Sequence, residues 1–374
     1  MSESQAPGSQ HGGDIWGAAL AAGLNPTKFV DFSASINPLG PPPRVLAALQ
    51  ERLSLLRFYP DPESRELRQA LAGFRGLPPE YILAGNGGAE VIYLLARLLA
   101  GRRAVILQPT FSEYQRAWEA AGGRQILHLE LKREGAFQPS LRVLTSLISS
   151  QDVVFWCNPN NPTGTYLEPD VLLPYLDLFT KKGALVILDE SFVDFAGVSL
   201  AGVGRPWIEK GQLILLGSLT KIFALPGLRL GYALAAPQWC NQLNQQRDPW
   251  SVNLLAQVAG VAAVKEKGFL EKSRNFIAVE RERLVGKLRS IPGLDVLPSQ
   301  VNFLLLELKQ RLTAAQLRQR LLSEGVLIRA ADNFPFLGPG FFRVAVRVPV
   351  ENDRLVDKLQ VILANAGDHP AGSG

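Results

Sequence analysis

Short apolar segments alternate with amphipathic segments between about residues 62 and 236. The apolar runs are 81–84, 104–108, 125–130, 152–157, 184–189, 213–217 and 230–235. Continuous runs of Val, Ile and Leu are expected of strands that are covered on both faces. The segments with helical periodicity are 66–74, 89–100, 111–121 and 169–182. This alternation predicts an α/β fold with a mainly parallel, doubly wound sheet in a large domain.

The pattern changes after Pro249, where a long and mostly helical stretch covers residues 252–290 with a break near Gly268. Shorter strand-like and helix-like segments follow at 301–308, 313–324, 326–329, 342–346 and 351–364. They predict a smaller α+β domain. We expect residues 1–50 to form an N-terminal arm and part of the small domain. Residues 51–255 would form the large domain, and residues 256–374 the small C-terminal domain.

Composition narrows the class of protein. The chain has 374 residues, of which 47% are hydrophobic and 20% charged, as in ordinary globular proteins. Two cysteines (Cys157 and Cys240) and three histidines leave little material for a disulfide scaffold or a structural zinc site. The net charge of +5 is spread along the chain without a Lys/Arg block, so we expect no nucleic-acid partner. Anionic small molecules suit this charge at least as well.

No segment has the length and apolarity of a membrane span, which needs about 20 nearly uncharged residues. The most apolar stretch, 213–236, is interrupted by Lys221, Pro226 and Arg229. The first ten residues are polar and do not resemble a secretory signal. We therefore expect a cytoplasmic protein with no membrane partner.

Chemically distinctive strings follow the predicted strands. These strings are GNGGAE (85–90), PTF (109–111), NPNNPTG (158–164), DE (189–190) and SLTKIFALPGLRLG (218–231). Open parallel sheets bind ligands at the carboxyl ends of their strands. No GxGxxG and no GK[ST] string is present, so neither a dinucleotide fingerprint nor a P-loop is predicted.

Lys221 is the sharpest candidate among these residues. A lysine amine becomes nucleophilic when desolvation or nearby charge lowers its pKa, and a strand-end cleft supplies both. The hydroxyls of Ser218 and Thr220 and the guanidinium of Arg229 could form a phosphate cradle with the glycine-rich turn at Gly88. Taken singly, the lysine could be a solvated rim residue and the turn an ordinary tight connection.

Asp189 ends an apolar run, where a carboxylate could keep a ring nitrogen protonated, or could simply cap the next element. Asn161 lies in a rigid proline-rich loop that could aim its amide at a ligand oxygen, or could be only a turn. A phosphate cradle, a carboxylate, an amide and a lysine together are the groups that pyridoxal phosphate requires.

As an ordered set, GNG, PTF, NPNNPTG, DE, SLTK and GLRLG resemble fold-type I pyridoxal-phosphate enzymes of the aminotransferase superfamily. The resemblance implies pyridoxal 5'-phosphate as cofactor and a homodimer with shared sites. It implies that Lys221 binds the cofactor covalently, Asp189 pairs with the ring nitrogen and Asn161 with the ring hydroxyl oxygen. The remaining implied contacts are Phe111 on the ring, Gly88, Ala89, Ser218, Thr220 and Arg229 at the phosphate, and Tyr59 at the phosphate of the neighbouring subunit. The family usually has tyrosine where this chain has Phe192.

A narrower resemblance is to the threonine-phosphate decarboxylases of cobalamin biosynthesis, with histidinol-phosphate aminotransferases as near relatives. It rests on the strings HGGD (11–14), FSASINPLGPP (32–42), DPWSVN (248–253), LIRAADNFP (327–335) and FFRVAVR (341–347). It implies conversion of L-threonine O-3-phosphate to (R)-1-amino-2-propanol O-2-phosphate. Ser35 stands where asparagine is expected.

Such a substrate needs two anion anchors besides the cofactor cradle. The resemblance assigns Arg343 to the carboxylate and Arg329 to the substrate phosphate, with His11 assisting and Ser35 nearby. Each arginine could instead form a structural ion pair, and His11 could belong to a loose tail. Decarboxylation and transamination require the same cofactor residues, so the alternative is a histidinol-phosphate aminotransferase or a related class I/II aminotransferase. A binding protein without turnover is a third possibility, against which the intact Lys221 and Asp189 argue.

Overall fold

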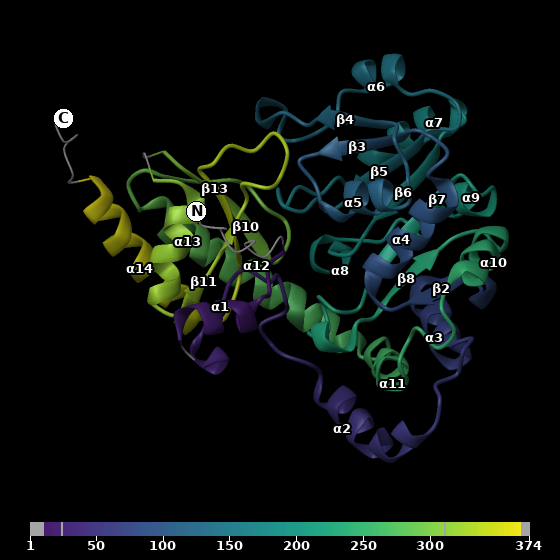
Figure 1. Ribbon diagram of the computed structural model, residues 1–374, viewed down its shortest axis with the longest axis horizontal. Helices are drawn as coiled ribbons and strands as arrows, with labels where there is room; N and C mark the ends of the chain where they lie inside the picture. The colour runs from purple at the N-terminus through teal and green to yellow at the C-terminus, as the bar shows by residue number, and fades with distance from the viewer. Residues whose placement is uncertain (1–10, 24, 310–311, 368–374) are drawn as a thin grey trace, which may run out of the picture. The chain divides into compact units, whose positions relative to one another are not determined.

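The computed structural model describes residues 11–23, 25–309 and 312–367 (Figure 1). The chain divides into two compact units. Unit 1 comprises the chain up to Pro38, residues 162–164 and the chain from Phe276 onward, and unit 2 comprises residues 39–161 and 165–275. These limits differ from the expected boundaries after residues 50 and 255, because helix α2 (Pro43–Arg52) packs against α11 (Leu254–Ala263) and both lie in unit 2.

Unit 2 contains a seven-stranded sheet, and its α/β architecture confirms the predicted fold class. The strands, in spatial order, are β2 (Ile82–Gly85), β8 (Gly231–Leu234), β7 (Leu213–Ser218), β6 (Leu185–Asp189), β5 (Val153–Cys157), β3 (Ala104–Gln108) and β4 (Ile126–Glu130). Strand β8 is antiparallel to both of its neighbours, and the other pairs are parallel. β8 can return directly because a short 3-10 turn (Pro226–Leu228), and no crossover helix, separates it from β7.

Helices connect the strands of unit 2, as Figure 1 shows. They are α3 (Arg65–Arg75), α4 (Gly87–Leu99), α5 (Glu113–Ala120), α6 (Leu141–Leu147), α7 (Pro169–Lys181), α8 (Val193–Ala196), α9 (Arg205–Glu209) and α10 (Pro237–Gln246). The long helical stretch predicted over 252–290 is divided into α11 and α12 (Lys267–Arg289), close to the predicted break.

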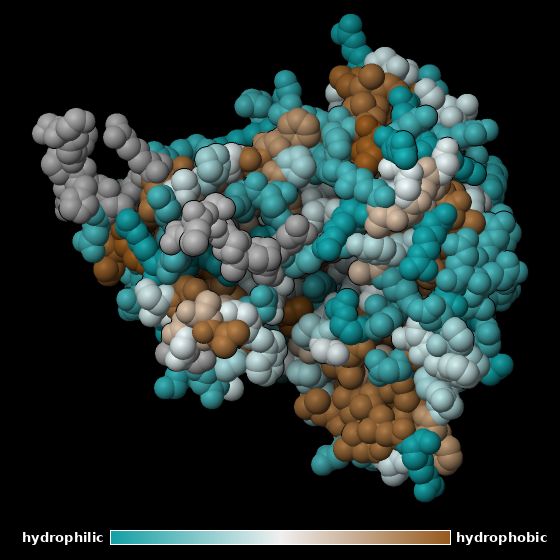
Figure 2. Space-filling model, in the orientation of Figure 1, coloured by the Kyte–Doolittle hydropathy of each residue, from teal (hydrophilic) through white to brown (hydrophobic). Residues whose placement is uncertain are grey.

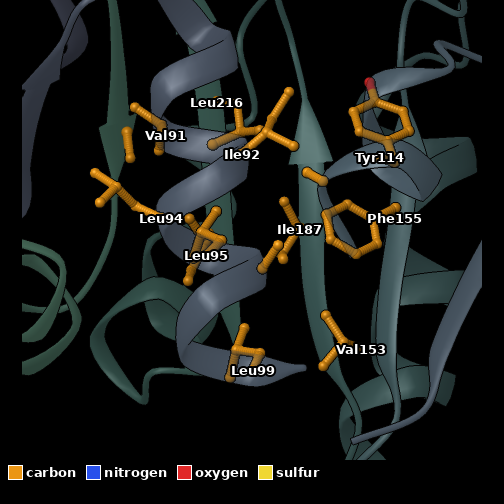
Figure 3. Packing of buried hydrophobic residues seen from close by; sticks show 14 of the residues in the cluster. Val91, Ile92, Leu94, Leu95, Leu99, Tyr114, Val153, Phe155, Ile187 and Leu216 are labelled. Carbon is orange, nitrogen blue, oxygen red and sulfur yellow. The ribbon is translucent and has the colours of Figure 1, made fainter. Parts of the chain in front are cut away.

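The core of unit 2 forms between α4 and the sheet. Val91, Leu95 and Leu99 recur at four-residue intervals, so they project from one face of α4, and all three are buried. Figure 3 shows them against Ile187 and Leu216 of the neighbouring strands. Each such side chain stabilises the fold by about 1.5–3 kcal/mol. Every residue of β2, β3, β5, β6, β7 and β8 is buried, as continuous apolar runs predict.

Unit 1 is an α+β unit, as predicted. Its four-stranded antiparallel sheet has the order β12 (Arg329–Ala330), β13 (Phe341–Ala345), β10 (Phe303–Leu308), β9 (Leu294–Val296). The N-terminal segment adds β1 (Val30–Asp31), which pairs in parallel with β11 (Val326–Leu327). The helices of this unit are α1 (Ile15–Ala22), α13 (Ala314–Ser323), α14 (Pro349–Gly367) and the second half of α12.

One predicted strand of unit 1 is divided. The run 326–329 contains two short strands separated at Ile328. The first, β11, belongs to the two-stranded sheet with β1, and the second, β12, belongs to the four-stranded sheet. The helix predicted from residue 313 begins as expected, since Thr313 and Gln316 form a capping box at the start of α13. Among the residues that the structure describes, no helix combines the length and the apolarity needed to cross a membrane.

Candidate active site

Three neighbouring parallel strands of unit 2 end beside each other and carry the predicted site residues. Asp189 is the last residue of β6, and Ser218 is the last residue of β7. Cys157, at the end of β5, is the cross-strand partner of Asp189, so Asn161 follows on the same edge of the sheet. The structure thus brings residues 158–161, 189–190 and 218–221 of unit 2 to one edge of its sheet.

The predicted phosphate cradle is formed by close backbone approach. Gly88 and Ala89 lie in the first turn of α4, where backbone N–H groups have no partner within the helix. A Cβ atom on Gly87 would lie 2.6 Å from Nη2 of Arg229, and one on Gly231 would lie 2.4 Å from the backbone nitrogen of Gly88. Because both residues are glycine, the Arg229 guanidinium can approach Gly87, and the backbone of Gly231 can approach the start of α4.

Hydroxyl groups complete this space on the side of β7. The Ser218 and Thr220 hydroxyl oxygens are 2.8 Å apart, and both residues are buried. Lys221 follows directly, and its Nζ atom is 6.0 Å from the centre of the Phe192 ring. Phe192 is buried, so the position that carries tyrosine in the wider family here offers Lys221 an apolar surface.

Asp189 is held in one orientation by two donors. The backbone N–H of Ser191 donates to Oδ1 at 2.8 Å, and the Tyr114 hydroxyl donates to Oδ2 at 2.7 Å. Tyr114 was not among the predicted site residues. It lies in the first turn of α5, three residues after Phe111, and the two rings meet edge to face with centres 5.7 Å apart.

The loops that carry Phe111 and Asn161 are joined by a second residue that the sequence analysis missed. Asn160 accepts a hydrogen bond from the Thr110 hydroxyl at 3.0 Å and donates one to the Pro109 carbonyl oxygen at 2.9 Å. Its side chain thereby fixes the PTF string against the NPNN string. The sequence predicted a ligand contact for Asn161 and no role for Asn160, because nothing in the local sequence shows which of two adjacent asparagines joins the two loops.

These residues fit pyridoxal 5'-phosphate. The cradle of helix-start amides, two hydroxyls and the Arg229 guanidinium supplies the donors that a phosphate dianion needs. A Cβ atom on Gly87 or Gly231 would fill that cradle. Asp189 supplies an anion for a ring nitrogen, and Lys221 supplies an amine for the cofactor carbonyl. Their roles remain predictions, which the geometry supports.

Glu190, the second residue of the DE string, is buried and binds a neighbouring loop. Its Oε2 accepts a hydrogen bond from the Ser199 hydroxyl at 2.5 Å, and its Oε1 accepts one from the Leu200 N–H at 2.7 Å. Burial raises the pKa of the Glu190 carboxyl from 4.5 to about 7, although these hydrogen bonds and the charge of Arg75 oppose the rise. The folded state therefore holds this proton more tightly than the unfolded chain does.

We predict that Glu190→Gln stabilises the protein above pH 7. The penalty for ionising Glu190 is absent below about pH 4.5, grows as the pH rises through 7 and is complete above it. Glutamine can accept from Leu200 and donate to Ser199, so both contacts persist. The gain in the free energy of urea unfolding should be roughly 2–3 kcal/mol larger at pH 8 than at pH 5. An equal effect at both pH values would contradict the prediction. Glu209→Gln is the control, because the Glu209 side chain on α9 is exposed.

Unit 1 contains the two predicted anion anchors as a cross-strand pair. Arg329 on β12 and Arg343 on β13 are directly opposed in the antiparallel register, and both are buried. Burial lowers the pKa of both guanidinium groups, and the charge of Arg329 lowers that of Arg343 further. Like charges opposed on neighbouring strands repel each other, so an anion bound here would stabilise the pair.

His11 lies in the same unit and lines a small pocket. Ser33, two arginines (Arg318 and Arg329) and one acidic residue (Asp14) also line this pocket. Ser35 is buried, and its Oγ has no hydrogen-bond partner among the described residues. Arg343 donates to the Ser33 carbonyl oxygen at 2.8 Å, which ties the anion anchor to the FSAS string.

Tyr59 is separate from the cluster at the strand ends. It is 78% exposed and stacks on Trp250 with a ring-centre distance of 4.6 Å.

Arg347 pairs with Glu351 at 2.8 Å and serves unit 1 structurally. In the part of the chain that the structure describes, no three His, Cys, Asp or Glu side chains gather as metal ligands would.

Comparisons with known proteins cover nearly the whole chain. Residues 27–359 match the family Aminotransferase class I and II. A threonine-phosphate decarboxylase of Salmonella typhimurium is 38% identical over 356 residues, 95% of this chain and 97% of that protein. A histidinol-phosphate aminotransferase of Moorella thermoacetica is 34% identical over 343 residues, 90% and 86% of the two chains. The crystal structure of L-threonine-O-3-phosphate decarboxylase from Porphyromonas gingivalis has a TM-score of 0.78 and 27% identity, covering 89% of this chain and 99% of that one.

Proposed function

Because this chain belongs to the aminotransferase class I and II family, we propose that it decarboxylates L-threonine O-3-phosphate with pyridoxal 5'-phosphate as cofactor. The predicted resemblance to this family is confirmed. The product of the proposed reaction is (R)-1-amino-2-propanol O-2-phosphate, a precursor suited to the aminopropanol arm of cobalamin.

The buried arginine pair carries this proposal. A substrate with both a carboxylate and a phosphate presents two anions, and Arg343 and Arg329 offer two forks on adjacent strands. Either anion would relieve the repulsion between the opposed guanidinium groups. The pocket beside His11 and Arg318 adds donors on the Arg329 side, which favours Arg329 as the anchor for the more highly charged phosphate.

The proposed chemistry assigns one task to each residue of the chain. When bound, pyridoxal phosphate accepts the electrons released when a bond to the substrate Cα breaks. The cradle at Gly88, Ser218 and Arg229 anchors its phosphate, and Asp189 keeps its ring nitrogen protonated. Lys221 holds the cofactor carbonyl before the reaction and afterwards delivers a proton to the substrate Cα. Arg343 and Arg329 orient the substrate, which determines whether the Cα–carboxylate bond or the covalent Cα–H bond is the one that breaks.

Two assays test the reaction. The holoenzyme is given L-threonine O-3-phosphate alone, and release of CO₂ is measured. It is then given histidinol phosphate with 2-oxoglutarate, and formation of glutamate is measured. We expect CO₂ from the first mixture and little glutamate from the second. Glutamate formation without CO₂ would overturn the proposal in favour of histidinol-phosphate aminotransferase, the alternative that the 34% identical relative supports.

We also propose that the enzyme is a homodimer. Leu46, Leu53, Leu56 and Phe58 are large apolar side chains of α2 and the turn after it, and about half or more of each is exposed. Figure 2 shows an apolar patch over α2, larger than scattered surface residues would produce. Tyr59 directly follows this patch in the sequence. If a second copy of the chain packs on the patch, Tyr59 of the first copy lies close to the surface of the second. This arrangement supports the predicted role of Tyr59 at the neighbouring cofactor phosphate.

Leu56→Glu should therefore shift the protein from dimer toward monomer in sedimentation velocity. A charge buried in an apolar interface costs several kcal/mol, so the dissociation constant should rise by at least about a hundredfold. Val361→Glu is the matched control, because Val361 on α14 is 59% exposed and Leu56 is 58% exposed. A Leu56→Glu protein that sediments as the wild type does would contradict the assignment of this patch.

A further inference from the structure

Tyr114 is a buried tyrosine whose hydroxyl contacts the Asp189 carboxylate, so it can act on Asp189 as well as fill the core. Its hydroxyl donates to Asp189 Oδ2 at 2.7 Å, and the side chain is 1% exposed. We infer that Tyr114 is a positioning residue that holds the Asp189 carboxylate and, through Asp189, tunes the protonation of the cofactor ring nitrogen. The inference rests on the proposed pairing of Asp189 with that nitrogen, but on neither of the two possible reactions.

The Tyr114 hydroxyl is fixed in place by its own ring. The ring stacks on Phe155 of β5 with centres 5.4 Å apart and an interplanar angle of 18°. It also meets the Phe111 ring edge to face, with an interplanar angle of 85°. The Tyr114 side chain therefore contacts both Phe111, which is predicted to lie on the cofactor ring, and Asp189. Figure 3 shows the Tyr114 oxygen pointing away from Phe155 and the apolar core. The hydroxyl therefore has little freedom to leave the carboxylate.

Both oxygens of Asp189 receive a hydrogen bond, Oδ1 from the Ser191 backbone and Oδ2 from Tyr114. Hydrogen bonds to a carboxylate favour its ionised form. Burial, with the nearby charge of Asp189, raises the pKa of Tyr114 well above its ordinary value. Burial likewise raises the pKa of the adjacent Cys157 thiol. Tyr114 and Cys157 thus stay neutral at physiological pH, so the Tyr114 hydroxyl remains a hydrogen-bond donor to Asp189.

Loss of the hydroxyl has a defined electronic consequence. With one donor fewer in a buried site, the Asp189 carboxylate binds a proton more tightly. The proton that it shares with the ring nitrogen then moves toward Asp189, and the ring loses positive charge. A less positive ring repels the proton on the Lys221 linkage less strongly. The visible chromophore of the resting enzyme should therefore titrate at higher pH.

Tyr114→Phe tests this inference because it keeps both ring contacts and removes only the hydroxyl. The absorption spectrum of the holoenzyme is recorded against pH without substrate. We expect the titration midpoint to rise by about one unit, a tenfold change in proton affinity. Tyr93→Phe is the matched control, since Tyr93 donates its hydroxyl to Glu113 Oε2 at 2.9 Å in the same unit. The control should leave the midpoint unchanged, and thermal unfolding confirms that both variants fold.

Asp189→Asn separates this inference from the pairing on which it rests. A spectrum unchanged by Asp189→Asn would overturn the ring-nitrogen pairing, and the inference with it. A midpoint moved by Asp189→Asn but not by Tyr114→Phe would overturn the inference alone. In the double variant, Tyr114→Phe should add no further shift to that of Asp189→Asn. An additive shift would show that Tyr114 acts independently of Asp189, which also contradicts the inference.

Discussion

Lys221→Ala should give a folded protein without the visible chromophore of a lysine-bound cofactor. The amine is the group proposed both to hold the cofactor carbonyl and to move a proton at the substrate Cα. Its removal should lower kcat/KM by at least about a thousandfold, since proton transfer alone contributes about 10²–10⁴-fold. The cradle at Gly88, Ser218 and Arg229 remains, so free pyridoxal phosphate should still bind, more weakly and reversibly on dialysis.

The covalent bond can be measured without turnover. Borohydride treatment of the wild-type holoenzyme should add the mass of the reduced cofactor to the peptide that contains Lys221, and Lys221→Ala should show no added mass there. Lys210→Ala provides the control, because Lys210 is an exposed lysine of the same unit. A variant at position 221 that retains the chromophore would overturn the assignment of this lysine.

The strand-end residues were predictable because their signals are local. An apolar run such as 104–108 ends where β3 ends, and a polar string after a buried strand has to lie at the carboxyl edge of the sheet. Family resemblance then supplied roles for Asp189, Asn161 and Arg229. The orientation of β8 was not predictable to the same degree, because it depends on the absence of a crossover helix after Lys221.

The supporting residues could not be predicted because their partners are remote in sequence. Tyr114 and Asp189 are separated by 75 residues, and Arg75 and Asp194 by 119. The opposition of Arg329 and Arg343 depends on the register between two strands, which no local pattern specifies. Asp189 and Arg75 are polar groups that would be costly to bury alone, and each has a remote partner, whereas Arg329 and Arg343 repel each other. Long-range contacts thus position polar groups that the periodicity of the chain does not predict.

The buried ion pair between Arg75 and Asp194 should contribute strongly to the stability of unit 2. Arg75 donates from both terminal nitrogens to Asp194, at 3.0 and 2.7 Å, and from Nε to the Tyr232 hydroxyl at 2.6 Å. The two side chains are 8% and 7% exposed. Burial alone would lower the pKa of Arg75, but Asp194 raises it above the ordinary value, so the guanidinium stays charged.

Asp194→Asn should therefore lower the free energy of unfolding by about 3–5 kcal/mol, because it leaves a buried guanidinium without its counterion. Urea unfolding at pH 7 measures the loss. Glu209→Gln is the matched control. It breaks the 2.7 Å pair with Arg205, whose side chains are 48% and 43% exposed, and it should cost at most about 1 kcal/mol. Replacing both buried partners, as Arg75→Met with Asp194→Leu, should recover much of the loss, since apolar side chains of similar volume carry no desolvation penalty. If Asp194→Asn cost no more than Glu209→Gln, the Arg75–Asp194 pair would have to be regarded as incidental to folding.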